Sequence, residues 1–122
     1  MSVTAFQDLP MADRDRAWDG AAAEQRVRAW AGATEAPTEK YRQAHVWYDR
    51  DRKDRFTGYK LLIADVVGGR LVAVPRGVMA AAAVMQGSRG GAQLPRQDIS
   101  RVKSHLAKYY KKMNETAPWE RQ

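Results

Sequence analysis

The sequence has 122 residues, the length of one domain, and its composition of 44% hydrophobic and 29% charged residues is typical of a chain that folds around one core. It contains no cysteine, which excludes disulfide bonds, thiol nucleophiles and thiolate zinc sites, and its two histidines are too few for a three-histidine metal site. No apolar run approaches the roughly 20 residues that a bilayer-spanning helix needs, so we expect a soluble protein that stays in the cytoplasm where it is made.

The formal net charge is +7, from 21 basic and 14 acidic residues. Residues 1–87 contain 13 basic and 11 acidic side chains, a net of +2, whereas residues 88–122 contain 8 basic and 3 acidic ones, a net of +5. The excess therefore lies in the last third. A cationic surface favours encounter with nucleic acid, acidic proteins or anionic surfaces, but it does not determine the fold.

Residues 1–18 carry alternating charges without an apolar period, so we expect an extended N-terminal arm, a kind of segment that is often mobile. The rest, 19–122, is predicted to be a single α+β domain. Asp19 is a suitable N-cap for a helix over 20–31, because its carboxylate can accept the free amide protons of the first turn.

Strand signals follow. The segment 41–48 is rich in aromatic and branched residues, as strands are. Two apolar runs, 59–67 and 70–75, are separated only by two glycines, a pair that readily adopts the positive φ angles of a tight hairpin. We therefore predict a three-stranded antiparallel sheet.

Two further helices are predicted after the hairpin. Residues 76–86 are apolar almost all round, which is typical of a buried helix. Residues 95–113 place apolar side chains at steps of three or four, the pattern of an amphipathic helix. The expected fold is thus α+β, with a three-stranded sheet covered by about three helices, ending in a long basic amphipathic helix. Trp119, in the tail that follows, is expected to fold back onto the body of the protein.

Four basic side chains of the last helix lie within about 60 degrees of one another, at about 100 degrees per residue, opposite the apolar side. They are Arg101, His105, Lys108 and Lys112. No acidic residue stands four positions away to relieve their repulsion, whereas an anionic partner would do so. The alternative is an ordinary solvated helix face.

Arg89, in the glycine-rich segment 88–91, is a secondary candidate for contact with an anion. The segment lacks the Lys-Ser/Thr ending of a phosphate-binding loop. A simple turn between two helices is the alternative.

The sequence indicates no catalytic, metal or cofactor site. His45 and His105 belong to no Ser/His/Asp pattern in the sequence. Asp49, Asp51 and Asp54 are close together, but the positions where an EF-hand requires its third ligand and its final glutamate hold lysines, which favours a surface loop. We therefore expect a protein that is not an enzyme.

Three segments together resemble a small domain of unknown function from tailed phages and prophages, mostly of actinobacteria. They are `DLPMADRDRAWDG` (8–20), `YKLLIADVVGGRLVAVPRGVMAAAAVMQGSRGG` (59–91) and `LPRQDISRVKSHLAKYYKKM` (94–113). In that group the domain stands alone or is appended to the prohead (capsid maturation) protease. The resemblance implies a context of head morphogenesis, in the cytoplasm of the bacterial host cell or in association with the virion. It carries over neither protease residues nor binding residues.

From these features we expect a non-enzymatic phage or prophage protein that binds a capsid or assembly protein, or the nucleic acid backbone, through Arg101, Lys108 and Lys112, with His105 and Arg89 as secondary contacts. One alternative is a dedicated nucleic-acid-binding protein that uses the same stripe. Another is an inhibitor of a host enzyme or defence system.

Overall fold

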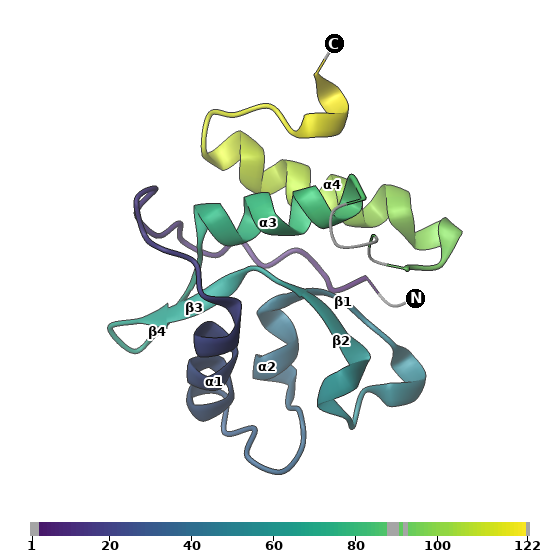
Figure 1. The fold of residues 1–122 in the computed structure, drawn as a ribbon. Coiled ribbons are helices and arrows are strands. Elements are labelled where there is room, and N and C mark those ends of the chain that lie inside the picture. Colours follow the sequence, from purple (N-terminus) through teal and green to yellow (C-terminus); the bar gives the residue numbers. More distant parts are fainter. Residues whose placement is uncertain (1–2, 88–90, 92, 122) are drawn as a thin grey trace.

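The computed structural model describes residues 3–87, 91 and 93–121, and Figure 1 shows their arrangement in layers. The helices and strands are α1 (Gly20–Trp30), α2 (Glu39–Gln43), β1 (His45–Tyr48), β2 (Tyr59–Leu62), β3 (Ala64–Val67), β4 (Arg70–Ala73), α3 (Pro75–Met85) and α4 (Arg96–Lys112). The strands lie between one layer formed by α3 and α4 and another formed by α1 and α2. The predicted α+β class and the long final helix are confirmed, with four α-helices in the described part instead of about three.

Local sequence signals place most of these elements correctly. The Asp19 side chain accepts a hydrogen bond from the Ala22 amide (3.1 Å) and starts α1 as predicted. Gly68 and Gly69 have φ angles of 59° and 78°, and they join β3 to β4 in the predicted antiparallel hairpin. Trp119 also folds back, with its ring 6.3 Å from that of Tyr110.

Helix α2 was not predicted, because the strand was expected to begin at residue 41. Thr38 caps this short helix by accepting a hydrogen bond from the Tyr41 amide (3.2 Å). A threonine followed by Glu39 is an N-terminal helix signal, but the aromatic and branched residues that follow favour a strand. The strand begins only at His45.

The prediction of a three-stranded sheet is wrong: the four strands pair in two separate two-stranded sheets, β1 with β2 and β3 with β4, all antiparallel. The expected strand 59–67 is bent, because Leu61 adopts a left-handed φ of 62°. Its first half pairs with β1 and its second half with β4. At the junction, the Ile63 amide donates to the Ala44 carbonyl (3.0 Å) and the Ile63 carbonyl accepts from the Val74 amide (2.9 Å).

The N-terminal arm is held to the rest of the chain along its length. The Thr4 amide donates to the Val46 carbonyl in β1 (2.9 Å), and the Ala73 amide in β4 donates to the Pro10 carbonyl (2.9 Å). Further along, Arg16 pairs with the buried Asp65 of β3 (3.0 Å). The arm thus follows both sheets, and in Figure 1 it runs below α3 and α4.

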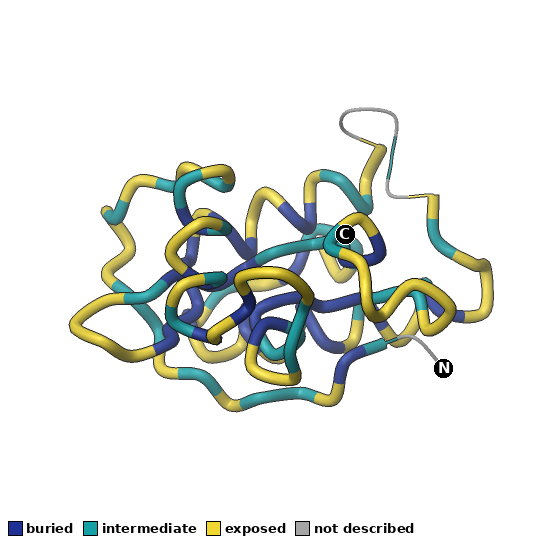
Figure 2. The backbone as a smooth tube through the Cα atoms, turned by 90° about the horizontal axis from the view of Figure 1, so that it is seen from below, coloured by how far each residue is buried: buried dark blue, intermediate teal, exposed yellow. Residues whose placement is uncertain are grey.

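The apolar core has two parts, one on each side of the strands. One part joins β1 and β4 to α3 and α4, and includes Val46, Ala73, Val78 and Leu106. The other lies toward α1 and α2 around Tyr41. Figure 2 shows the buried residues in the interior and the exposed ones in the outer loops and turns.

Gly58 is predicted to be intolerant of any side chain. A Cβ atom there would lie 2.4 Å from the Arg52 carbonyl oxygen, a backbone atom that cannot move aside without shifting the turn. We expect Gly58→Ala to lower the free energy of unfolding by about 1–3 kcal/mol, measured by urea denaturation. Gly20→Ala is the control, since its nearest contact would be an ordinary 3.7 Å from Trp18, and an equal loss there would contradict the explanation.

Candidate functional site

The stripe predicted on α4 does not form a continuous exposed surface, because the N-terminal arm covers part of it. His105 was expected on the polar side of the helix, but it is buried, with 7% of its surface exposed. Its Nδ1–H donates to the Thr4 carbonyl (3.0 Å), and its ring packs against Phe6, 5.5 Å between centroids. Burial lowers the pKa of His105 to about 4, so it is uncharged at neutral pH and is no cationic contact.

Two of the predicted lysines also contact the arm. Lys112 forms an ion pair with Asp8 (2.6 Å) and donates a hydrogen bond to the Leu9 carbonyl. The Lys108 ammonium lies 5.0 Å from the centre of the Phe6 ring, a cation–π distance, while Lys108 itself stays exposed. Through Asp8, the arm therefore supplies part of the anionic environment that the stripe is predicted to find in another molecule.

Arg101 is exposed on α4, as predicted. Lys111, which the sequence analysis did not select, is exposed on the same helix. Arg89 lies outside the described residues. Arg101 and Lys108 thus remain at the surface, while His105 is buried and Lys112 is paired with the arm.

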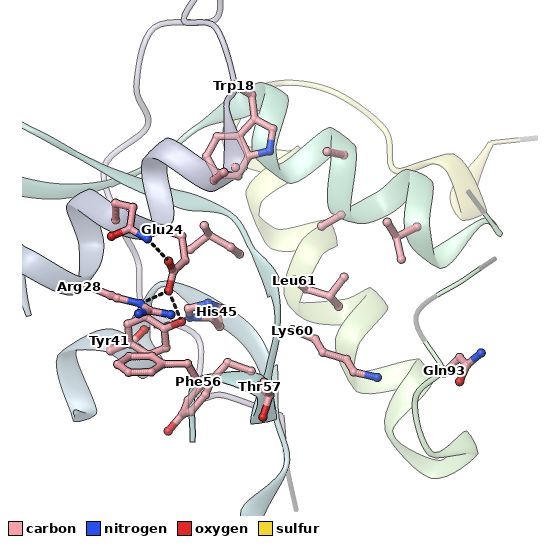
Figure 3. Close-up of a pocket in the computed structure, with 18 of the residues that line it drawn as sticks. Trp18, Glu24, Arg28, Tyr41, His45, Phe56, Thr57, Lys60, Leu61 and Gln93 are labelled. Carbon is pink, nitrogen blue, oxygen red and sulfur yellow. Dashed lines mark hydrogen bonds and ion pairs between the residues drawn. The ribbon is translucent and has the colours of Figure 1, made fainter. Parts of the chain in front are cut away.

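A cleft with a volume of about 880 Å³ is bordered by α1, β2 and α3. No residue of α4 is among the described residues that line it. Trp18 lies at one end, and Leu61 and Lys60 of β2 lie along it (Figure 3). Ala80 and Val84 of α3 also line it and form an apolar wall. The volume is within the range of about 300–1,000 Å³ that is usual for ligand sites.

A cluster of polar side chains forms the opposite wall of the cleft. The Glu24 carboxylate accepts a hydrogen bond from the Tyr41 hydroxyl (2.8 Å) and pairs with Arg28 (Figure 3). The Arg28 guanidinium stacks on the Phe56 ring at 3.6 Å from its centre. Burial, and then the bond to Glu24, raise the pKa of the Tyr41 hydroxyl above its usual value. These groups form hydrogen bonds and an ion pair with one another, which holds their side chains in place. The charge of Arg28 offsets that of Glu24, so the wall is nearly neutral.

His45 lies beside this wall, 4.6 Å from the Tyr41 ring between centroids. Its Nδ1–H donates to the Tyr41 backbone carbonyl (3.0 Å), which leaves the lone pair on Nε2. Burial lowers the pKa of His45 to about 4, although the hydrogen bond to Tyr41 acts in the opposite direction. His45 is therefore neutral at pH 7.

Sequence reasoning missed the cleft because its walls come from segments far apart in the chain and match no motif. The one sequence signal near it is the absence of charge from residue 77 to residue 86. That run was attributed to a buried helix, but Met79, Ala80 and Ala83 of α3 are exposed.

Within the residues that the structure describes, no three His, Asp or Glu side chains are grouped so that they could hold a metal ion. None of the described helices is both long enough and apolar enough to cross a membrane. Comparison with known proteins gave no match to this chain among family models, curated proteins or solved structures.

Proposed function

We propose that this chain is a non-enzymatic binding protein of phage or prophage origin that acts in head morphogenesis by contacting an anionic capsid or assembly protein. The observation that carries the proposal is the exposed cationic side of α4. Arg101, Lys108 and Lys111 follow one another at steps of seven and three residues, which places them on the same side of the helix. Residues 99–114 contain no acidic side chain.

A protein partner is favoured over nucleic acid by the surroundings of these cations. Glu115 and Glu120 of the C-terminal segment border the same shallow hollow as Lys108 and Lys111. A nucleic acid backbone presents only negative charge and would be repelled by both glutamates, whereas a protein surface can match mixed charges. The burial of His105 and the pairing of Lys112 further reduce the cationic stripe that the nucleic-acid alternative requires.

A binding role is also supported by the internal pairing of three polar side chains in the cleft. Glu24, Arg28 and Tyr41 bond to one another, so each is already occupied by a neighbour. A catalytic acid or base must instead reach a substrate atom.

The proposal is tested by co-sedimentation with heads assembled from the major capsid protein encoded in the same genome. We expect the double variant Lys108→Glu, Lys111→Glu to bind at least about tenfold more weakly, because each reversal removes an attraction and adds a repulsion. Lys53→Glu with Arg55→Glu is the matched control, since it changes the net charge equally in an exposed loop.

Equal losses in the two double variants would show that only the net charge matters and would contradict a specific role for α4. Absence of co-sedimentation at low salt would contradict the proposal itself. A gel shift with duplex DNA that weakens steeply as salt is added would instead support the nucleic-acid alternative.

A further inference from the structure

A groove follows α4 on the side that faces the C-terminal segment. Two neighbouring hollows form it, with volumes of about 580 and 300 Å³, and they share Ser104, Ala107 and Glu120. We propose that this groove binds an extended acidic segment of the partner protein and that an apolar side chain of the segment packs against Trp119. The inference deepens the proposed function by naming the part of the partner that is bound, and it rests on that function only in assuming that the partner is an acidic protein.

The first argument is the length of the groove. The residues of α4 that line it include Arg96, Ser100, Lys103, Ala107 and Lys111, which follow one another at steps of four or three and so lie on one side of the helix. From the first to the last of them the helix rises about 22 Å, at about 1.5 Å per residue. An extended chain covers that length with about seven residues, at about 3.3 Å each. The groove therefore fits a short extended segment.

The second argument is the tryptophan on one side of the groove. Trp119 belongs to the turn Pro118–Glu120, drawn in yellow in Figure 1, and it lines the larger hollow together with Ile99. Its half-buried ring lies 6.3 Å from that of Tyr110 between centroids, and the Lys103 ammonium lies 5.7 Å from its centre. Tryptophan is enriched at the energetically dominant positions of protein interfaces. An apolar side chain of the partner is therefore expected to pack against this ring.

Charge selects the occupant. The charged residues among those described as lining the two hollows are Arg96, Lys103, Lys108, Lys111, Glu115 and Glu120, a sum of +2 (four cations less two anions). Glu115 already pairs with Arg14 (2.8 Å), whereas within the described part of the chain none of the four cations forms an ion pair. The residues outside that part have no acidic side chain that could offset the excess. An acidic segment is therefore attracted.

Two other occupants are disfavoured. A second copy of this chain, with its net charge of +7, would be repelled. A nucleic acid backbone would meet the Glu120 carboxylate at the place where the two hollows join, whereas a peptide can have an uncharged residue there. The expected segment thus has acidic residues at both ends and an apolar residue between them.

The test is fluorescence anisotropy with two labelled heptapeptides and the full chain. In one peptide a central leucine is flanked by three aspartates on each side, and in the other a serine replaces the leucine. We expect the leucine peptide to bind about tenfold more tightly or better, because its apolar side chain leaves water to pack against Trp119.

Two variants locate the binding in the groove. Trp119→Ala should remove the advantage of the leucine peptide and leave the affinity for the serine peptide nearly unchanged. Lys103→Glu should weaken both peptides about tenfold or more, because it reverses a charge inside the groove. Lys53→Glu is the matched control, since it makes the same change of charge in an exposed loop that does not line the groove, and it should leave most of the affinity intact.

Ala107→Glu keeps Trp119 in place, in case the loss of the ring disturbs the C-terminal segment. It puts a carboxylate where the two hollows join, so it should weaken both peptides more than Lys53→Glu does, although it changes the net charge by one unit instead of two. An effect no larger than that of Lys53→Glu would show that the peptides bind elsewhere and would overturn the inference.

Other results would overturn it as well. They are equal affinities for the two peptides, a leucine advantage that persists in Trp119→Ala, and no binding of either peptide at low salt. Duplex DNA that binds more tightly than the leucine peptide and is weakened equally by Lys103→Glu would make the occupant a nucleic acid. A concentration-dependent dimer that Lys103→Glu abolishes would make it a second copy.

This test and that of the proposed function can fail separately. Loss of head binding in the variant Lys108→Glu, Lys111→Glu, without any advantage of the leucine peptide, would reject only the groove. Binding of the leucine peptide that depends on Trp119, in a protein that never sediments with heads, would reject only the role in head morphogenesis.

Discussion

As the pH is lowered, the free energy of unfolding of this protein is expected to fall in two stages, and the first stage is caused by the two buried histidines. Burial lowers the pKa of His45 and of His105 from 6.5 to about 4. Between these values the unfolded chain binds two protons that the folded chain does not bind. Stability is therefore complete above about pH 6.5 and falls as the pH drops toward 4, by up to about 3 kcal/mol for each histidine.

The second step lies at lower pH and belongs to Asp65. Burial alone would raise the pKa of this carboxyl, but hydrogen bonds from Arg26 and Arg16 lower it from 3.8 to about 2. A lowered carboxyl pKa stabilises the folded state above pH 3.8, and that contribution is lost as the pH falls toward 2.

Urea denaturation at a series of pH values measures the first step. His45→Asn and His105→Asn keep a donor near the position of Nδ1 and remove the titration. Each variant should be less stable than the unchanged protein at pH 7. In each, the slope of the free energy of unfolding against pH should be smaller by about 1.4 kcal/mol per pH unit between pH 4 and 6.5. A slope that stays the same in both variants would contradict the assignment to histidine.

Removal of the N-terminal arm is expected to lower the free energy of unfolding about as much as acid does. Deleting residues 1–9 takes away the Thr4 amide bond to β1, the Phe6 ring on α4 and the Asp8 partner of Lys112. With about 1 kcal/mol for each hydrogen bond and about 2 kcal/mol for a half-buried phenylalanine, we expect a loss on the order of 5 kcal/mol. Many domains have a total stability of only about 5–15 kcal/mol.

Phe6→Ala is the milder variant, in case the shortened chain does not fold. Its ring lies 4.9 Å from that of Tyr109 and 5.5 Å from that of His105 between centroids. Besides a loss of about 2 kcal/mol, we expect the His105 pKa to rise toward 6.5 in an NMR titration, because water reaches the ring. Val67→Ala, at a residue that is 41% exposed, should change neither quantity. An unaltered His105 titration in Phe6→Ala would contradict the role given to the arm.

The sequence predicted the local elements well because their signals are local. The cap at Asp19, the glycine pair at 68–69 and the apolar period of α4 each depend on a few neighbouring residues. The division into two sheets could not be predicted in the same way. The bend that divides the strand lies at Leu61, and a left-handed φ is predicted from sequence only where a glycine stands.

The candidate site was predicted less well, and for a physical reason. A helical projection gives the side of α4 on which His105 lies, but it cannot show what covers that side. The covering residues, Thr4 and Phe6, are about a hundred positions away in the chain. Arg101 and Lys108 were placed correctly at the surface because nothing from the arm buries them.

The bond between Thr4 and His105 joins residues 101 positions apart, which has a consequence for how the chain is made. The arm is synthesised about a hundred residues before the surface that holds it. At a translation rate of about 5–20 residues per second, about 5–20 seconds pass between the synthesis of the arm and that of α4. During this interval Phe6 has no partner from α4, so nascent chains are expected to recruit chaperones until α4 has been synthesised.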